Sequence, residues 1–178
     1  LPGTKRENND PVFDWLRDNS PPNKDLFQGL KTRHVLAAGE DIATDMVIAA
    51  RAAMADAGIG PEDVDGITGF LSNSEYLTPN GLALVHQKLG LGPHAWVRPV
   101  ADNFTNFFTG LSMADAAVGA GTARNVIVVC GCNWSRMVDY HTAQAITAGD
   151  GAGAAVVGLS DDKSRFRVVA EGAIMDTS

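Results

Sequence analysis

The chain has 178 residues and a formal net charge of −7, from 21 acidic and 14 basic side chains. This length suits one α/β domain with a sizeable core, and an acidic balance without a run of Lys or Arg argues against a nucleic acid or a membrane surface as partner. No stretch approaches the roughly 20 apolar residues of a membrane span, and residues 1–10 are polar and unlike a signal peptide, so we expect a cytoplasmic protein.

Residues 1–40 are predicted to form an irregular arm within the domain, with turn sequences around a short amphipathic piece at 12–17. From Asp41 to Gly58, apolar residues recur at spacings of three and four, which predicts a helix that Gly58 ends. The apolar run at 67–71 predicts a short buried strand. Pro79 is expected to open a second helix that reaches Leu89.

A strand is predicted at 95–100, followed by a long helix that begins near Asn103. One apolar stripe of this helix comprises Phe104, Phe107, Phe108, Leu111, Ala114 and Val118. Gly119 and Gly121 end the helix. The β-branched run at 126–130 is typical of strands covered on both faces, which predicts a central position in the sheet.

The last third of the chain is predicted to hold a helix or loop at 134–145, a strand at 154–159 and an edge strand at 165–173. Strands that alternate with helices indicate parallel pairing, and the final strand pair indicates one antiparallel edge. The expected fold class is therefore α/β, a layered βαβαβαββ unit with a mixed five-stranded sheet.

The segment AITAGDGAGAAVVG at 145–158, with the preceding segment at 123–140, resembles the β-ketoacyl-acyl-carrier-protein synthase III branch of the thiolase superfamily. The resemblance continues upstream through 41–67, 76–97 and 111–126. A full subunit of that family has two similar halves, so the resemblance implies that residues 41–178 form the N-terminal thiolase-fold half, with a buried central helix. It also implies a tight structural turn at 149–154, with Asp150 bonding backbone amides.

The family places its catalytic Cys at the N-terminus of the buried helix, where the helix dipole lowers the thiol pKa and backbone N–H groups can bind an oxyanion. A His and an Asn from the second half complete that site. Alignment without a gap from LSMADA puts Phe104 in the Cys position, between Asn103 and Thr105. Phe104 cannot accept an acyl group, and it is either a core residue on the helix stripe or a plug in an acyl channel.

Thr105 is the candidate replacement nucleophile, although its hydroxyl needs a base. As ordinary structural residues, Thr105 and Asn103 would cap the first helical turn. Cys130 and Cys132 lie at the end of the central strand and are either a displaced nucleophile or inert buried residues. Their spacing suits neither a relaxed disulfide nor a four-ligand zinc site, and we expect no metal.

The family uses a Trp and an Arg of the arm to bind the adenine of coenzyme A, and the resemblance assigns Trp15 to this role. The matching Arg is absent, and Lys24 and Arg33 are candidates to supply its charge. Thr78 and Phe107 are assigned to the acyl pocket, with Thr78 matching a residue that reaches into the partner's pocket in the family's dimer.

The resemblance implies an acyltransferase or condensing enzyme of fatty-acid or polyketide biosynthesis. Its substrates would be acyl-CoA or an acyl carrier protein, with no further cofactor. The alternative is an inactive partner subunit that stabilises or shapes an active homologue. In either case a second thiolase-fold half is expected to cover the central helix, and the strand at 95–100 is expected to form the dimer edge.

Overall fold

The computed structural model describes residues 1–21, 25–74, 78–102, 104–162, 166–169 and 172. Its main body is a mixed sheet with the strand order β4-β3-β5-β6. The strands are β3 (Gly66–Leu71), β4 (Trp96–Pro99), β5 (Asn125–Asn133) and β6 (Asp150–Gly158). β3 pairs in parallel with β4 and β5, and β5 pairs antiparallel with β6. The predicted mixed α/β architecture is therefore confirmed.

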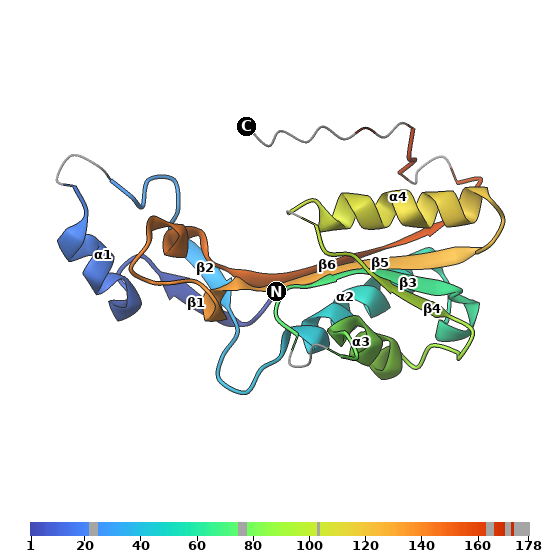
Figure 1. Cartoon of the computed structure of the whole chain (residues 1–178), viewed down its shortest axis with the longest axis horizontal. Coiled ribbons are helices and arrows are strands. Elements are labelled where there is room, and N and C mark those ends of the chain that lie inside the picture. The colour runs from blue at the N-terminus through green and yellow to red at the C-terminus, as the bar shows by residue number, and fades with distance from the viewer. Residues whose placement is uncertain (22–24, 75–77, 103, 163–165, 170–171, 173–178) are drawn as a thin grey trace.

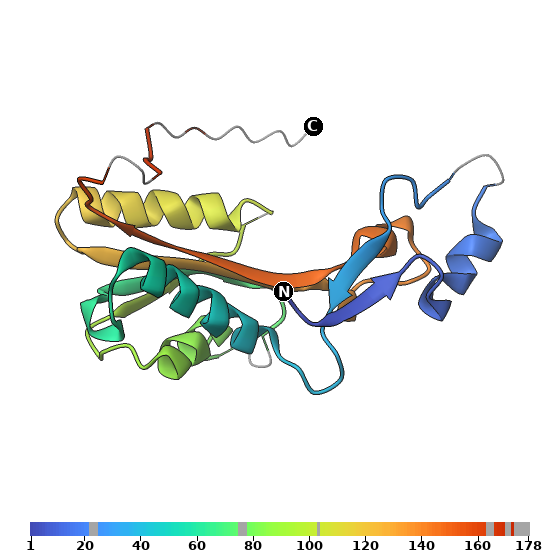
Figure 2. The ribbon, with the colours of Figure 1, turned by 180° about the vertical axis from the view of Figure 1, so that it is seen from behind.

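Three helices cover the two faces of this sheet. α2 (Ile42–Ala57) and α3 (Gly81–Leu89) lie on one face, and α4 (Asn106–Gly119) lies alone on the other (Figures 1 and 2). Asp41 caps α2 by accepting the Thr44 N–H, and Gly58 ends it in the left-handed conformation with φ 70°. The predicted helix at 41–57 is confirmed.

The α3 helix begins later than the proline signal predicted. The side chain of Asn80 accepts the N–H of Leu82 at 2.9 Å, so Asn80 is the N-cap and Pro79 lies outside the helix. A side-chain acceptor at the N-cap satisfies one of the unpaired N–H groups of the first turn. The prediction of Pro79 as the first helical residue is therefore wrong, whereas the helix reaches Leu89 as expected and has Gly90 as its C-cap.

The central position predicted for the strand at 126–130 is confirmed, because β5 lies between β3 and β6. Its side chains alternate between two cores. Ile127 and Val129 join the core under α2 and α3, whereas Val126 and Val128 join the core under α4. Each of the four side chains is fully buried.

The arm at 1–40 is more regular than predicted. Thr4–Glu7 (β1) and Thr32–Val35 (β2) form an antiparallel pair, and Asp14–Asn19 forms the short helix α1. These elements extend beyond one end of the main sheet (Figure 1). Phe13 and Leu16 pack there on Ala145 and Ile146. Sequence reasoning missed the pair because its strands are short and separated by a long connection.

The glycine-rich segment at 149–154 differs from the expected turn. β6 begins at Asp150, so most of the segment lies inside a strand that is longer than predicted. The Asp150 carboxylate accepts the N–H of Leu36 at 2.8 Å and the N–H of Ser135 at 2.9 Å. The expected structural role of Asp150 in bonding backbone amides is confirmed.

The described residues within 165–173 do not form the predicted edge strand. Residues 166–169 have no strand conformation and are exposed, while 165, 170–171 and 173 lie outside the described residues. The main sheet of the described chain therefore has the four strands given above.

No helix among the described residues combines the length and apolar character of a membrane span.

Candidate active site at the start of α4

The turn that leads into α4 holds Phe104 in an unusual conformation. Its φ is 63°, and among the described residues it is the one non-glycine residue with a positive φ. A side chain in the left-handed region costs on the order of 1–2 kcal/mol. Such strained residues cluster at functional sites.

Phe104 does not belong to the core. Its side chain is 85% exposed, and its ring lies 5.6 Å from the ring of Trp134, measured between centroids. The interpretation of Phe104 as a core residue on the helix stripe is therefore wrong. The physical reason is that α4 begins only at Asn106, so Phe104 lies outside the helical periodicity.

Polar groups are tightly organised around Asp102. Its carboxylate accepts the hydroxyl of Thr105 at 2.6 Å and the hydroxyl of Thr109 at 2.7 Å. Its N–H donates to Oδ1 of Asn106 at 2.6 Å. Thr105 occupies the N-cap position of α4 without a side-chain cap bond, and Asp102 is placed as the acceptor that a hydroxyl nucleophile would need.

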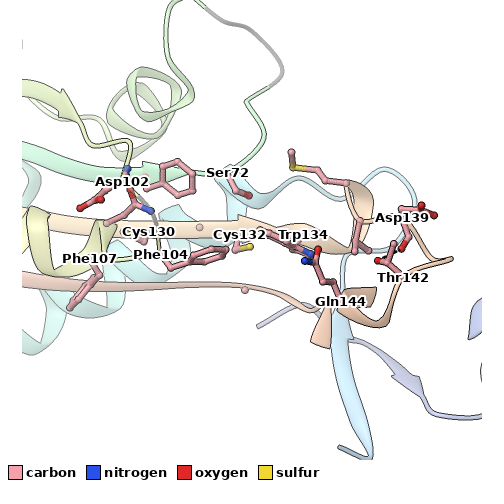
Figure 3. Close-up of a pocket in the computed structure, with 16 residues that line it drawn as sticks. Ser72, Asp102, Phe104, Phe107, Cys130, Cys132, Trp134, Asp139, Thr142 and Gln144 are labelled. Carbon is pink, nitrogen blue, oxygen red and sulfur yellow. Dashed lines mark hydrogen bonds between the residues drawn. The ribbon is translucent and has the colours of Figure 1, made fainter. Parts of the chain in front are cut away.

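A cavity of about 710 Å³ opens beside this turn (Figure 3). Its apolar lining includes Phe70, Phe107, Trp134, Met137 and Val138. Asp102, Phe104 and Asn106 also line it, whereas Thr105 is not among the described lining residues. The cavity has the size and character of pockets that hold small apolar ligands.

Both cysteines line the same cavity, and neither forms a disulfide. Burial raises the pKa of the Cys130 thiol, which disfavours its thiolate form. Within the described residues, no group of three His, Cys, Asp or Glu side chains is placed to hold a metal ion.

The residues assigned to the acyl pocket do not come together. Phe107 lines the cavity beside Phe104, whereas Thr78 lines a second cavity of about 900 Å³. The second cavity lies near the starts of α2 and α3, where Asp41 and Gly81 contribute to it. A role of Thr78 in a partner's pocket stays a prediction. Asn103 lies outside the described residues.

The arm residues assigned to coenzyme A binding have different surroundings. Trp15 is exposed on α1, and its ring centroid lies 4.9 Å from that of His141 in an edge-on arrangement. Arg33 is only 7% exposed, its Nε donates to the Ile146 carbonyl at 2.8 Å, and its guanidinium lies over the Phe13 ring. A phosphate could not reach Arg33 there, so that assignment is not supported. Lys24 lies outside the described residues.

Sequence reasoning did not assign Trp134 or Asn106 to the site. Trp134 directly follows β5, and the carboxyl ends of strands are where ligands bind in many α/β proteins. That position was the available signal for Trp134. Asn106 carried no comparable signal, because its place at the cavity depends on where α4 begins.

Comparison with known proteins gives consistent results. The model of the family 3-oxoacyl-[acyl-carrier-protein (ACP)] synthase III matches residues 100–173. The β-ketoacyl-[acyl-carrier-protein] synthase III of Cereibacter sphaeroides is 32% identical over 145 residues, which cover 81% of this chain and 42% of that protein. The corresponding protein of Neisseria gonorrhoeae is 33% identical, with 83% of this chain and 50% of that protein covered.

Solved structures agree with this result. The synthase III from Aquifex aeolicus aligns with a TM-score of 0.77 and 29% identity over 92% of this chain and 52% of that chain. The priming β-ketosynthase of the R1128 polyketide pathway aligns with a TM-score of 0.79 and 28% identity over 90% of this chain and 48% of that chain. The chain spans about half the length of the relatives it matches. Sequence and fold together identify the chain as a β-ketoacyl-acyl-carrier-protein synthase III-like protein of the thiolase superfamily.

Proposed function

We propose that this chain contributes one half of an acyltransferase or condensing enzyme that acts on acyl thioesters of coenzyme A or of an acyl carrier protein. One observation carries the proposal: an apolar cavity opens at the start of α4, directly beside the strained turn at Phe104. Fatty-acid or polyketide biosynthesis is the setting that its relatives' names suggest.

The described residues offer separate places for the acyl chain, the thioester carbonyl and the adenine. The acyl chain would lie in the cavity against Phe107 and Trp134, and the thioester carbonyl would face the first turn of α4, where N–H groups can bind a developing negative charge. The exposed pair of Trp15 and His141 offers rings on which an adenine can stack. Transfer would need an acyl-enzyme at a group other than Phe104, or direct reaction between two aligned substrates.

The test uses the full-length protein and a series of acyl-CoA and acyl-carrier-protein donors. Release of free thiol, with transfer of the acyl group to a second thioester or to water, is the expected result. The variant Phe104→Cys restores a thiol at the start of α4 and should acquire acylation at residue 104, detected by mass spectrometry. The matched control is Phe108→Cys, on the outer side of the same helix. No thiol release with any donor would contradict the proposal.

A second function is favoured by a different observation. Phe108 on α4 is 70% exposed and Phe104, just before the helix, is 85% exposed, and Phe104 cannot be acylated. A non-catalytic subunit that binds and stabilises an active homologue would present such a surface. Size-exclusion chromatography with a Cys-containing relative from the same source distinguishes the two proposals. A hetero-oligomer without activity of its own supports the second, and an active homo-oligomer contradicts it.

A further inference from the structure

The cavity beside Phe104 holds two thiols on one face of β5. Val126 and Val128 face α4, and Cys130 and Cys132 continue that alternating series. Gly131 between them faces α2, because a Cβ there would lie 2.6 Å from Cγ of Met46. Both thiols therefore point to the α4 side of the sheet, which agrees with their place in the cavity lining.

The two thiols differ in their surroundings. Cys130 pairs with Phe70 inside the β3–β5 register, and burial raises the pKa of its thiol. That register ends at Gly131, so Cys132 lies beyond the last β3 pair. In the view of Figure 3 its sulfur lies between the rings of Phe104 and Trp134, which line the same cavity. Cys132 is therefore the thiol nearer to the carboxyl end of β5.

A buried amide provides an independent sign of a ligand. Asn106 lines the cavity and is 7% exposed. Its Oδ1 accepts the Asp102 N–H at 2.6 Å, which fixes the orientation of the amide. Its Nδ2 has no hydrogen-bond partner in the described part of the chain, so both N–H groups are available to an acceptor in the cavity. A carbonyl oxygen that gains negative charge during acyl transfer is such an acceptor.

We propose that Cys132 accepts the acyl group, so that the nucleophile of this site lies at the end of β5 instead of at the start of α4. The inference rests on the proposed action on thioesters. The Cys132 thiolate attacks the carbonyl carbon, and the bond from that carbon to the donor sulfur breaks as the new carbon–sulfur bond forms. The proton lost by Cys132 ends on the donor thiol, and the products are S-acyl-Cys132 and free thiol.

The choice of Cys132 over Thr105 follows from chemistry and position. A thiol depends less on an adjacent base than a hydroxyl does. The Thr105 hydroxyl is already bonded to Asp102 and does not belong to the described cavity lining. Phe104 then serves as a wall of the cavity beside the acylated sulfur.

The experiment incubates the full-length protein with octanoyl-CoA in one arm and with an octanoyl acyl carrier protein in another. Acid-quenched samples are digested, and fragment masses locate the octanoyl group. The expected result is acylation of Cys132 that is lost in Cys132→Ala and Cys132→Ser and kept in the matched control Cys130→Ala. Thermal unfolding of Cys132→Ser verifies that the variant is folded. The arm with the stronger signal identifies the donor.

The possible results separate the two proposals. Acylation of Cys130 or Thr105, or an unchanged signal in Cys132→Ala, would overturn the assignment of Cys132. Thiol release without acylated Cys132 would overturn this inference and leave the proposed function in place. Absence of both binding and thiol release with either donor would overturn both.

Discussion

The two faces of the central sheet are built differently. On the face under α2 and α3, large side chains such as Met46, Leu82 and Val85 are fully buried. On the face under α4, three of the five buried helical residues are Gly or Ala, namely Gly110, Ala114 and Ala117. The close approach there is visible at Gly110, where a Cβ would lie 2.9 Å from Cγ1 of Val128.

This difference suggests that one face of the sheet mainly stabilises the fold and the other mainly forms the site. Two helices complete the core on the first face, whereas α4 has no described cover on its outer side and leaves Phe108 exposed. The cavity, the strained turn and both cysteines lie on the α4 face. We infer that the α2/α3 face supplies most of the folding free energy, and that the α4 face is reserved for ligands and for a second half.

The sharpest test compares two neighbouring valines of β5. Val129 faces α2 and α3, Val128 faces α4, and both are fully buried. Truncation of either to Ala removes about 1.6 kcal/mol of transfer free energy. Val129→Ala should cost about 2–3 kcal/mol in total, because its closed surroundings retain a cavity. Val128→Ala should stay near the transfer value, since α4 can move inward. Urea unfolding measures both, and equal losses would contradict the comparison.

The helix starts provide a second, smaller test. Burial of the Asp41 carboxyl acts to raise its pKa, but hydrogen bonds from the Thr44 hydroxyl and N–H, with Lys88 nearby, lower the pKa below its ordinary value. Asp41→Ala should cost about 1 kcal/mol at neutral pH. At the start of α4, Thr105 makes no side-chain cap bond, and Thr105→Ala should cost less than about 0.5 kcal/mol.

The pH dependence follows from the sign of the Asp41 shift. Because its pKa is lower in the folded state, the contribution of Asp41 is fully present above the unfolded-state pKa of about 3.9. It is lost as pH falls through the folded pKa. The stability difference between wild type and Asp41→Ala should therefore disappear in acid. A difference that persists at the lowest pH would show that the capping carboxylate is not its cause.

The smallest expected effect on stability is at Phe108. Because its side chain is 70% exposed, Phe108→Ser should change the free energy of unfolding of this chain by no more than about 0.5 kcal/mol. The same substitution should weaken association with a second half, since it removes an apolar contact from the uncovered side of α4. Unfolding and sedimentation measurements on the same variant test both statements. A large loss of stability without any change in association would contradict this assignment of the α4 face.

Local sequence patterns were sufficient where one element's own residues set the outcome. Repeats at three and four residues up to Gly58 define α2, and the unbroken β-branched run defines β5 as central. Such periodicities report which side of an element is buried. The chain order of strands and helices likewise predicted the mixed α/β fold, and the resemblance predicted a site at the start of α4.

The tertiary structure decided what depends on distant residues. The pairing of β1 with β2 joins segments separated by α1 and a long connection, and Arg33 is buried by contacts with Phe13 and Ile146. Phe104 follows the apolar spacing of α4 in the sequence, yet the late start of that helix and the positive φ turn its ring toward Trp134. By itself the sequence determined the long helix α2, the central strand β5 and the family, because periodicity and motifs are local. Only the folded chain decided which side chains share the cavity, because their proximity arises from strand pairing and helix placement across the whole sheet.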